Sequence, residues 1–244
     1  MTPAPSPQPR IAALDLARTL AVVGMVIYHF TFDLQMFGHV APGTIQQPFW
    51  HYFARLVAGS FVFLAGVGLW LAHGRGIRWP AFWRRFLMVA GAAALVSFAG
   101  IWVTPGGFIW FGILHSIAAA SLIGLAFLRL PAPVTLAFAA LAFALPWVAT
   151  DARFDSLWLI WLGLAETRPF MADYVPLLPW LAPFLAGIAL GRIGSKSGLW
   201  ARLTRATGPT FRKLTFPGRH SLVIYLLHQP IMVAGFLAYA WITR

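Results

Sequence analysis

One stretch, residues 11–37, constrains the fold of this chain most, because it is apolar, long enough to cross a bilayer and yet charged. About 20 helical residues at 1.5 Å each cover the ~30 Å hydrocarbon core. The stretch contains Asp15, Arg18, His29 and Asp33, whose spacings of three, eleven and four residues place them on one face of a helix. An ionisable side chain at membrane depth costs about 3 kcal/mol and normally faces the protein interior. The stretch therefore predicts a spanning helix that forms one wall of a polar cavity.

The composition also indicates a membrane protein. Hydrophobic residues make up 60% of the chain and charged residues 10%, against about 45–50% and 25% in soluble domains. A length of 244 residues fits one helical bundle and leaves no room for a separate soluble domain of ordinary size. Because the chain has no cysteine, disulfides and thiolate metal sites are excluded.

Apolar segments separated by polar or Pro/Gly-rich connections predict an all-α bundle of about seven spanning helices. The expected spans are residues 11–37, 52–71, 86–103, 108–130, 134–149, 177–192 and 221–242. In the long connection 150–176, the apolar patch LWLIWLGL is too short to span and predicts an interfacial or re-entrant segment. Residues 1–10 are expected to be a disordered tail, and residues 11–244 one transmembrane domain.

The distribution of lysine and arginine predicts the orientation in the membrane. With the N-terminus inside, thirteen of the 18 basic residues fall on inner segments and only Arg153, Arg168 and Arg244 on outer ones. The positive-inside rule therefore places the N-terminus and the basic linker 193–219 in the cytoplasm, as in a multi-pass protein of the inner cell membrane. This explains the net charge of +12 without nucleic acid, which is not an expected partner. Membrane lipids are expected partners, because the basic linker is suited to an anionic leaflet.

The His29–Asp33 pair lies at the outer end of the first span. A carboxylate four residues from an imidazole can orient it and raise its basicity, as a general base requires. The same pair is also consistent with a structural hydrogen bond between helices. Near the inner face, Asp15 and Arg18 are typical of a partly buried ion pair that needs no ligand.

Polar residues of other spans are expected at the same depths. Pro230 frees a backbone carbonyl within the last span, and cavities use such breaks. The residues concerned are Arg55 and Ser60 of the second span, His115 and Ser116 of the fourth, and Ser221, Tyr225, His228 and Gln229 of the seventh.

Such a polar interior is compatible with several functions. A retinal protein is disfavoured because the only lysines, Lys196 and Lys213, lie in the inner linker. A haem-binding electron-transfer protein would use histidines of different helices as axial ligands. A proton-coupled transporter would use the His–Asp pair as a relay. An acyltransferase would use a histidine as general base and arginines for an anionic donor.

Five sequence blocks, which cover most of the chain in order, resemble the bacterial relatives of heparan-α-glucosaminide N-acetyltransferase. The blocks are R-x4-D-x2-R from Arg10, M-V-x-Y-H-F-x-F-D-L at 25–34, FGILHSIA at 111–118, ADYVPLLPWLAPFLAGIALGR at 172–192 and GRHSLVIYLLHQPI at 218–231. The resemblance implies an integral-membrane acyltransferase that takes acetyl groups from cytosolic acetyl-CoA and delivers them across the bilayer. A sugar or similar small molecule would accept the group on a hydroxyl or amine. No metal is expected. A homo-oligomer is possible, and the sequence does not decide the oligomeric state.

The resemblance also implies roles for residues. The family histidine lies at the outer end of the first helix or in the following loop, so His29, oriented by Asp33, is the expected base and His39 its competitor. Thr19 stands where the family usually has glycine. Depth in the membrane, and not the resemblance, makes Arg18, Arg55 and Asp15 the expected CoA-binding residues. The expected substrate-binding residues are His115, Asp173, Tyr174, Ser221, Tyr225, His228 and Gln229.

Overall fold

The computed structural model describes residues 11–103, 107–167, 171, 173–204 and 209–243, and all structural statements concern these residues. Helices make up nearly all of the regular structure in this part of the chain. The α-helices are α1 (Ala12–Met36), α2 (Pro48–His73), α3 (Trp79–Val103), α4 (Ile113–Phe127), α5 (Ala132–Ala144), α6 (Leu177–Lys196), α7 (Leu199–Leu203), α8 (Pro209–Leu214), α9 (Phe216–Arg219) and α10 (Ser221–Ile242). The 3₁₀ helices are η1 (Thr44–Gln46), η2 (Leu145–Trp147), η3 (Ala152–Phe154) and η4 (Ile160–Leu162).

The predicted all-α membrane bundle is confirmed. Within the described ranges, α1, α2, α3, α6 and α10 are long and apolar enough to cross a membrane, while α4 and α5 are shorter apolar helices. The predicted tail 1–10 lies outside the described residues. The apolar patch 157–164 forms turns around η4, in which Ile160 and Leu164 are buried.

Several helix boundaries differ from those predicted. Helices α2 and α3 begin four and seven residues earlier than expected, at Pro48 and Trp79. In both, a proline stands in the first turn, where its missing N–H leaves no hydrogen bond unmade. Helix α4 begins five residues later than expected, at Ile113, and the predicted linker 193–219 contains α7, α8 and α9.

The core lies where α2 and α6 pack against each other. Val62 and Val67 of α2 and Phe184 of α6 are completely inaccessible to solvent. The two backbones approach so closely that a Cβ added to Gly66 would stand 2.0 Å from the Phe184 carbonyl oxygen. Small residues at helix interfaces allow this approach in membranes, where packing rather than the hydrophobic effect holds helices together.

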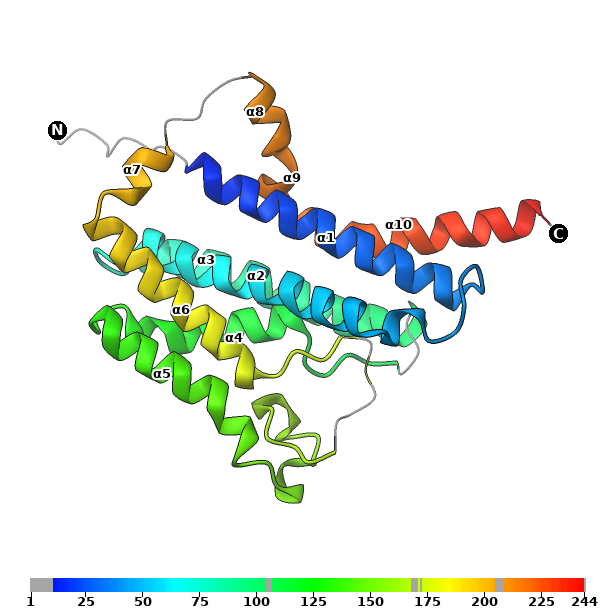
Figure 1. The fold of residues 1–244 in the computed structure, drawn as a ribbon, viewed down its shortest axis with the longest axis horizontal. Coiled ribbons are helices and arrows are strands. Elements are labelled where there is room, and N and C mark those ends of the chain that lie inside the picture. Colours follow the sequence, from blue (N-terminus) through cyan, green and yellow to red (C-terminus); the bar gives the residue numbers. More distant parts are fainter. Residues whose placement is uncertain (1–10, 104–106, 168–170, 172, 205–208, 244) are drawn as a thin grey trace.

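Helices α1 and α10 lie together at the edge of the bundle opposite α5, with α8 and α9 beside the start of α1 (Figure 1). Helix α10 has no fully buried residue, and its side chains Val223, Leu227 and Ile231 are more than half exposed. This apolar face is suited to lipid, whereas His228 and Gln229 of α10 contact α1. The polar face of α1 therefore acquires a partner near each of its two ends.

Candidate active site

Asp33 and Gln229 form a buried polar contact between α1 and α10. Asp33 is 0% exposed, and its Oδ1 accepts a hydrogen bond of 2.7 Å from Gln229 Nε2. Asp33 Oδ2 and Gln229 Oε1 are also buried, and neither has a hydrogen-bond partner among the described residues. A buried polar atom without a partner costs about 1–3 kcal/mol. The contact therefore retains two acceptor atoms that a bound molecule can satisfy.

Two histidines meet beside this contact. The ring of His29 on α1 lies 4.9 Å from the ring of His228 on α10, edge to face. His228 Nδ1 lies 2.7 Å from the Tyr225 carbonyl oxygen, which can only accept, so Nδ1 carries the proton. The other ring nitrogen, Nε2, is then a base, and it is buried without a partner in the described structure. The sequence predicted these residues on one cavity wall but not this tautomer.

Asp173 and Tyr225 connect this site to the start of α4. Tyr225 OH donates to Asp173 Oδ2 at 3.2 Å, and the same oxygen accepts the backbone N–H of Ile113 at 3.1 Å. Burial raises the pKa of the Asp173 carboxyl, although both hydrogen bonds act in the opposite direction. A Cβ on Gly112 would stand 2.3 Å from Asp173 Oδ2, so only glycine allows the carboxyl to reach this helix N-terminus.

His115 is held between α3 and α4 by both of its ring nitrogens. Its Nδ1 accepts the backbone N–H of Gly112 at 3.2 Å, which leaves Nε2 to donate to Ser97 Oγ at the same distance. Tyr174 OH donates to the Ile160 carbonyl oxygen at 2.7 Å, within the connection before α6. These two side chains are therefore occupied by protein contacts.

The structure places His39 apart from the histidine pair. His39 is exposed, and its ring lies 5.7 Å from Phe236 and 5.6 Å from Tyr239, near the far end of α10. It is three residues beyond the end of α1. Of the two histidines predicted as base, only His29 packs against His228, and it lies four residues before Asp33 on α1.

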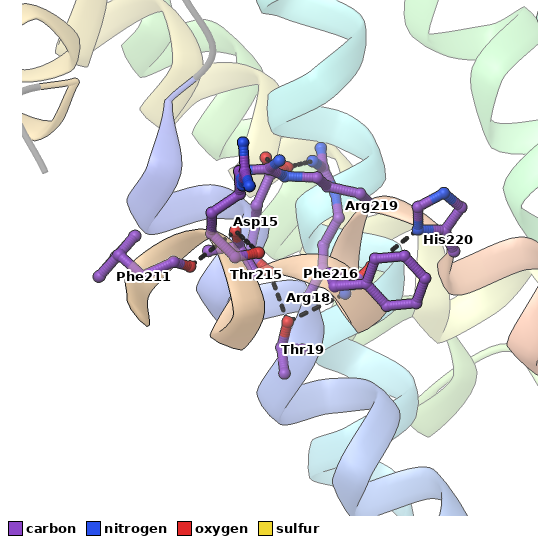
Figure 2. A network of polar contacts seen from close by, with 10 residues as sticks. Asp15, Arg18, Thr19, Phe211, Thr215, Phe216, Arg219 and His220 are labelled. Carbon is purple, nitrogen blue, oxygen red and sulfur yellow. Dashed lines mark hydrogen bonds and ion pairs between the residues drawn. The ribbon is translucent and has the colours of Figure 1, made fainter. Parts of the chain in front are cut away.

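A second polar cluster joins the start of α1 to α9 (Figure 2). Asp15 Oδ1 pairs with Arg18 Nη1 at 3.0 Å, and its Oδ2 lies 3.4 Å from Arg219 Nε. Thr19 Oγ1 donates to the Asp15 carbonyl oxygen at 3.1 Å and accepts the Gly218 N–H at 2.9 Å. The threonine that departs from the expected glycine thus fastens α9 to α1. The sequence predicted the Asp15–Arg18 pair and missed the contribution of α9.

A cavity of about 590 Å³ opens beside this cluster. Its lining residues are Arg212, Lys213, Phe216, Arg219 and His220, which come from α8, α9 and the residue before α10. The sequence indicated only a basic linker here. It could not show that Gly218 donates to Thr19 Oγ1 and so joins α9 to α1.

The predicted CoA ligands Arg18 and Arg55 do not come together. Arg18 lies against Gly68 of α2, with Nη2 3.5 Å from where a Cβ of that glycine would stand. Arg55 is exposed and lies thirteen residues earlier on α2, about 20 Å along the helix axis. Ser221 begins α10, eight residues or about 12 Å before Gln229. Arg18 and Arg55 therefore cannot bind one phosphate group, and Ser221 lies closer to the Asp15 cluster than to the histidines.

The two clusters share α1 and are separated along it. Asp15 and His29 are fourteen positions apart on one helix, which corresponds to about 21 Å. A ligand that reaches both must be elongated.

These features define a multi-pass α-helical membrane protein with a buried histidine site at one depth and a cationic pocket near one end. The family described as heparan-alpha-glucosaminide N-acetyltransferase, catalytic, matches residues 10–230, and the chain belongs to this family. It is accordingly a membrane acetyltransferase. No match to the chain was found among curated proteins or among solved structures.

Proposed function

We propose that the protein transfers an acetyl group from cytosolic acetyl-CoA to a hydroxyl or amine of a small-molecule or glycan acceptor, and that His29 is the general base. The observation that carries this proposal is the meeting of His29 and His228 at 4.9 Å beside the buried Asp33–Gln229 contact. Three buried atoms of this group, on Asp33, His228 and Gln229, lack partners in the described structure. They are suited to bind an acceptor that carries several hydroxyl or amine groups.

The proposed step needs one base and one departing thiolate. His29 takes the proton from the acceptor hydroxyl or amine, whose lone pair attacks the acetyl carbonyl carbon of acetyl-CoA. The carbon–sulfur bond then breaks, and the CoA thiolate leaves and takes up the proton. The Asp33 carboxylate favours the imidazolium that forms in between, and His228 Nε2 accepts a hydrogen bond from the acceptor.

The sidedness of the reaction follows from charge. The excess of lysine and arginine on the segments that include α7, α8 and α9 supports a cytoplasmic location for this end of the bundle. Acetyl-CoA would then approach the Asp15 cluster, and the acceptor would reach the His29 site from the other face of the inner cell membrane.

The test uses native membranes that contain the full chain and does not require the acceptor to be known. Acetyl-CoA labelled in its acetyl group is supplied to inverted vesicles, and the label in extracted lipid and sugar is counted. We expect His29→Ala to lower this transfer by about 10²–10⁴-fold, the usual effect of removing acid–base assistance. Right-side-out vesicles should not be labelled, because the donor cannot reach its site.

His39→Ala is the matched control, since it removes an exposed imidazole from the same region. It should retain transfer close to that of the unmodified protein. An inactive His39→Ala together with an active His29→Ala would move the base to the loop after α1.

A further inference from the structure

The cavity beside α8 and α9 is cationic. Three of its five lining residues, Arg212, Lys213 and Arg219, carry permanent positive charges, and none carries a carboxylate. Arg212 and Lys213 form no ion pair within the described ranges of the chain. Its volume of about 590 Å³ falls within the range of small-molecule sites, about 300–1,000 Å³.

The surroundings of the cavity do not neutralise this charge. The chain has six acidic residues, and only Asp15 lies at this end of the bundle. Asp15 is shared between Arg18 and Arg219, at 3.0 and 3.4 Å, so one carboxylate faces two guanidinium groups. Cations gathered in this way repel one another and favour a bound polyanion. Guanidinium groups bind phosphate with paired hydrogen bonds, and lysine binds it as a point charge.

The cavity also offers an aromatic surface. Phe216 is 58% exposed, and its ring lies 4.3 Å from the ring of His220, which also lines the cavity. An exposed ring next to cations is the arrangement by which proteins bind a nucleobase together with its phosphates. A phospholipid headgroup carries the phosphate but has no base to stack on the ring.

The segment that lines the cavity is held to its neighbours by hydrogen bonds. Thr215 is fully buried, and its Oγ1 donates to the Phe211 carbonyl oxygen at 2.9 Å, which joins α8 to α9. Gly218 donates to Thr19 Oγ1 at 2.9 Å, which joins α9 to α1 (Figure 2). A binding segment whose backbone is already positioned loses less entropy when a ligand binds.

We propose that Arg212, Lys213, Arg219 and Phe216 bind the nucleotide end of CoA, with the three cations on its phosphates and Phe216 on its adenine. This assignment deepens the proposed function, on which its identification of the ligand rests. It replaces Arg55, which lies about 20 Å along α2 from Gly68, the glycine beside Arg18, with residues of α8 and α9.

The experiment measures binding without turnover. The full chain is placed in phosphatidylcholine nanodiscs and titrated calorimetrically with CoA, dephospho-CoA and adenosine 3′,5′-bisphosphate, which carries the adenosine and two of the three phosphates of CoA. We expect CoA and the bisphosphate to bind and the combined substitution Arg212→Gln and Lys213→Gln to weaken both by about ten- to a hundredfold. Dephospho-CoA should bind more weakly than CoA, and all three affinities should fall with added salt.

Two further variants separate the contributions. Arg202→Gln removes an exposed arginine of the same basic linker that does not line the cavity, and it should leave CoA binding unchanged. Phe216→Leu should weaken binding of the bisphosphate and leave inorganic pyrophosphate unaffected, because pyrophosphate has no base.

Phosphatidylglycerol distinguishes a lipid from a nucleotide as the source of the phosphate. Two results together would identify a lipid site: phosphatidylglycerol in the nanodisc displaces the bisphosphate only when Arg212 and Lys213 are present, and CoA does not bind. The nucleotide assignment would then be wrong. Equal affinities of the unmodified chain and the double variant for every probe would overturn the phosphate site altogether.

Failure of the pocket and failure of the proposed function give different results. A chain that binds CoA through Arg212 and Lys213 but labels no acceptor retains the pocket and contradicts acetyl transfer. A chain that transfers acetyl groups with the same KM for acetyl-CoA in the double variant retains the function and contradicts the pocket.

Discussion

Asp15 and Asp33 lie on one face of α1, eighteen residues apart, and their surroundings differ in chemistry. Asp33 is fully buried and accepts its hydrogen bond from a neutral amide, that of Gln229. Asp15 pairs with two arginines beside an open cationic cavity. In a low-dielectric interior, a single hydrogen bond or proton has a large electrostatic effect on its neighbours. At the surface, several charges together bind an ion, but salt screens their interaction with it. One helix thus presents a buried carboxylate that accepts from a neutral amide and a second carboxylate that holds two arginines near a cationic cavity.

The largest expected effect tests the Asp33 end of this comparison. Asp33→Asn keeps the shape and can still accept from Gln229, but it removes the charge that favours the imidazolium. We expect the turnover number for acetyl transfer to fall by about 10²–10⁴-fold, with the KM for acetyl-CoA unchanged. Steady-state kinetics over a range of acetyl-CoA concentrations separates the two parameters. A raised KM with normal turnover would mean that both carboxylates serve donor binding.

A smaller effect is expected at the Asp15 end. A Cβ on Gly218 would stand 1.9 Å from the Asp15 carbonyl oxygen, so Gly218→Ala must push α9 away from α1 and weaken the Arg219–Asp15 contact. We expect about a tenfold loss of affinity for adenosine 3′,5′-bisphosphate, equal to about 1.4 kcal/mol, with turnover at saturating acetyl-CoA retained. Gly235→Ala in α10 is the control, since nothing lies within 4 Å of its Cβ position. A normal affinity of Gly218→Ala would show that α9 does not shape the pocket.

The smallest expected effect concerns Asp173, a carboxyl that belongs to neither end of α1. Burial raises its pKa, so its contribution to stability is full below the unfolded pKa of about 3.9 and is lost as pH rises through the folded pKa. Asp173→Asn keeps an oxygen for Ile113 and Tyr225 but cannot ionise. The melting temperature of this variant, relative to the unmodified chain, should therefore increase as pH rises from 4 to 8.

Asp151 provides the contrasting control for this measurement. Hydrogen bonds from Arg153 lower its pKa to about 2, so its contribution is present above the unfolded pKa and is lost as pH falls through the folded pKa. The difference between Asp151→Asn and the unmodified chain should then be constant above about pH 5. A constant difference for Asp173→Asn as well would show that burial does not control the Asp173 carboxyl.

The sequence predicted the helices better than the contacts between them. Apolar length alone predicted α1 and α10 almost to the residue, because a membrane requires a span of fixed length. Helix starts near Pro48 and Trp79 were placed too late, because basic or aromatic residues there resembled a connection. Within one helix, periodicity also predicted correctly that Asp15 pairs with Arg18.

Contacts between helices depend on rotation about each helix axis, which no local spacing specifies. The i, i+4 spacing suggested that Asp33 faces His29, but its hydrogen bond goes to Gln229, 196 residues later. The contact of Gly218 with Thr19, which joins α9 to α1, likewise links residues 199 positions apart. Charge counting along the linker indicated a membrane surface and could not indicate that α8 and α9 line an open cavity.

The uninterrupted length of α1 has a consequence for donor selection. With the nucleotide held beside Asp15 and the chemistry at His29, about 21 Å of helix lies between them, and the pantetheine arm of CoA would have to cover that distance. The spacing along the helix would then select the length of the thiol that carries the acyl group, and not the acyl group itself. Thioesters of short thiols would reach the histidines but would lack a nucleotide to bind beside Asp15. Longer acyl chains on CoA would be excluded only by the size of the site around His29.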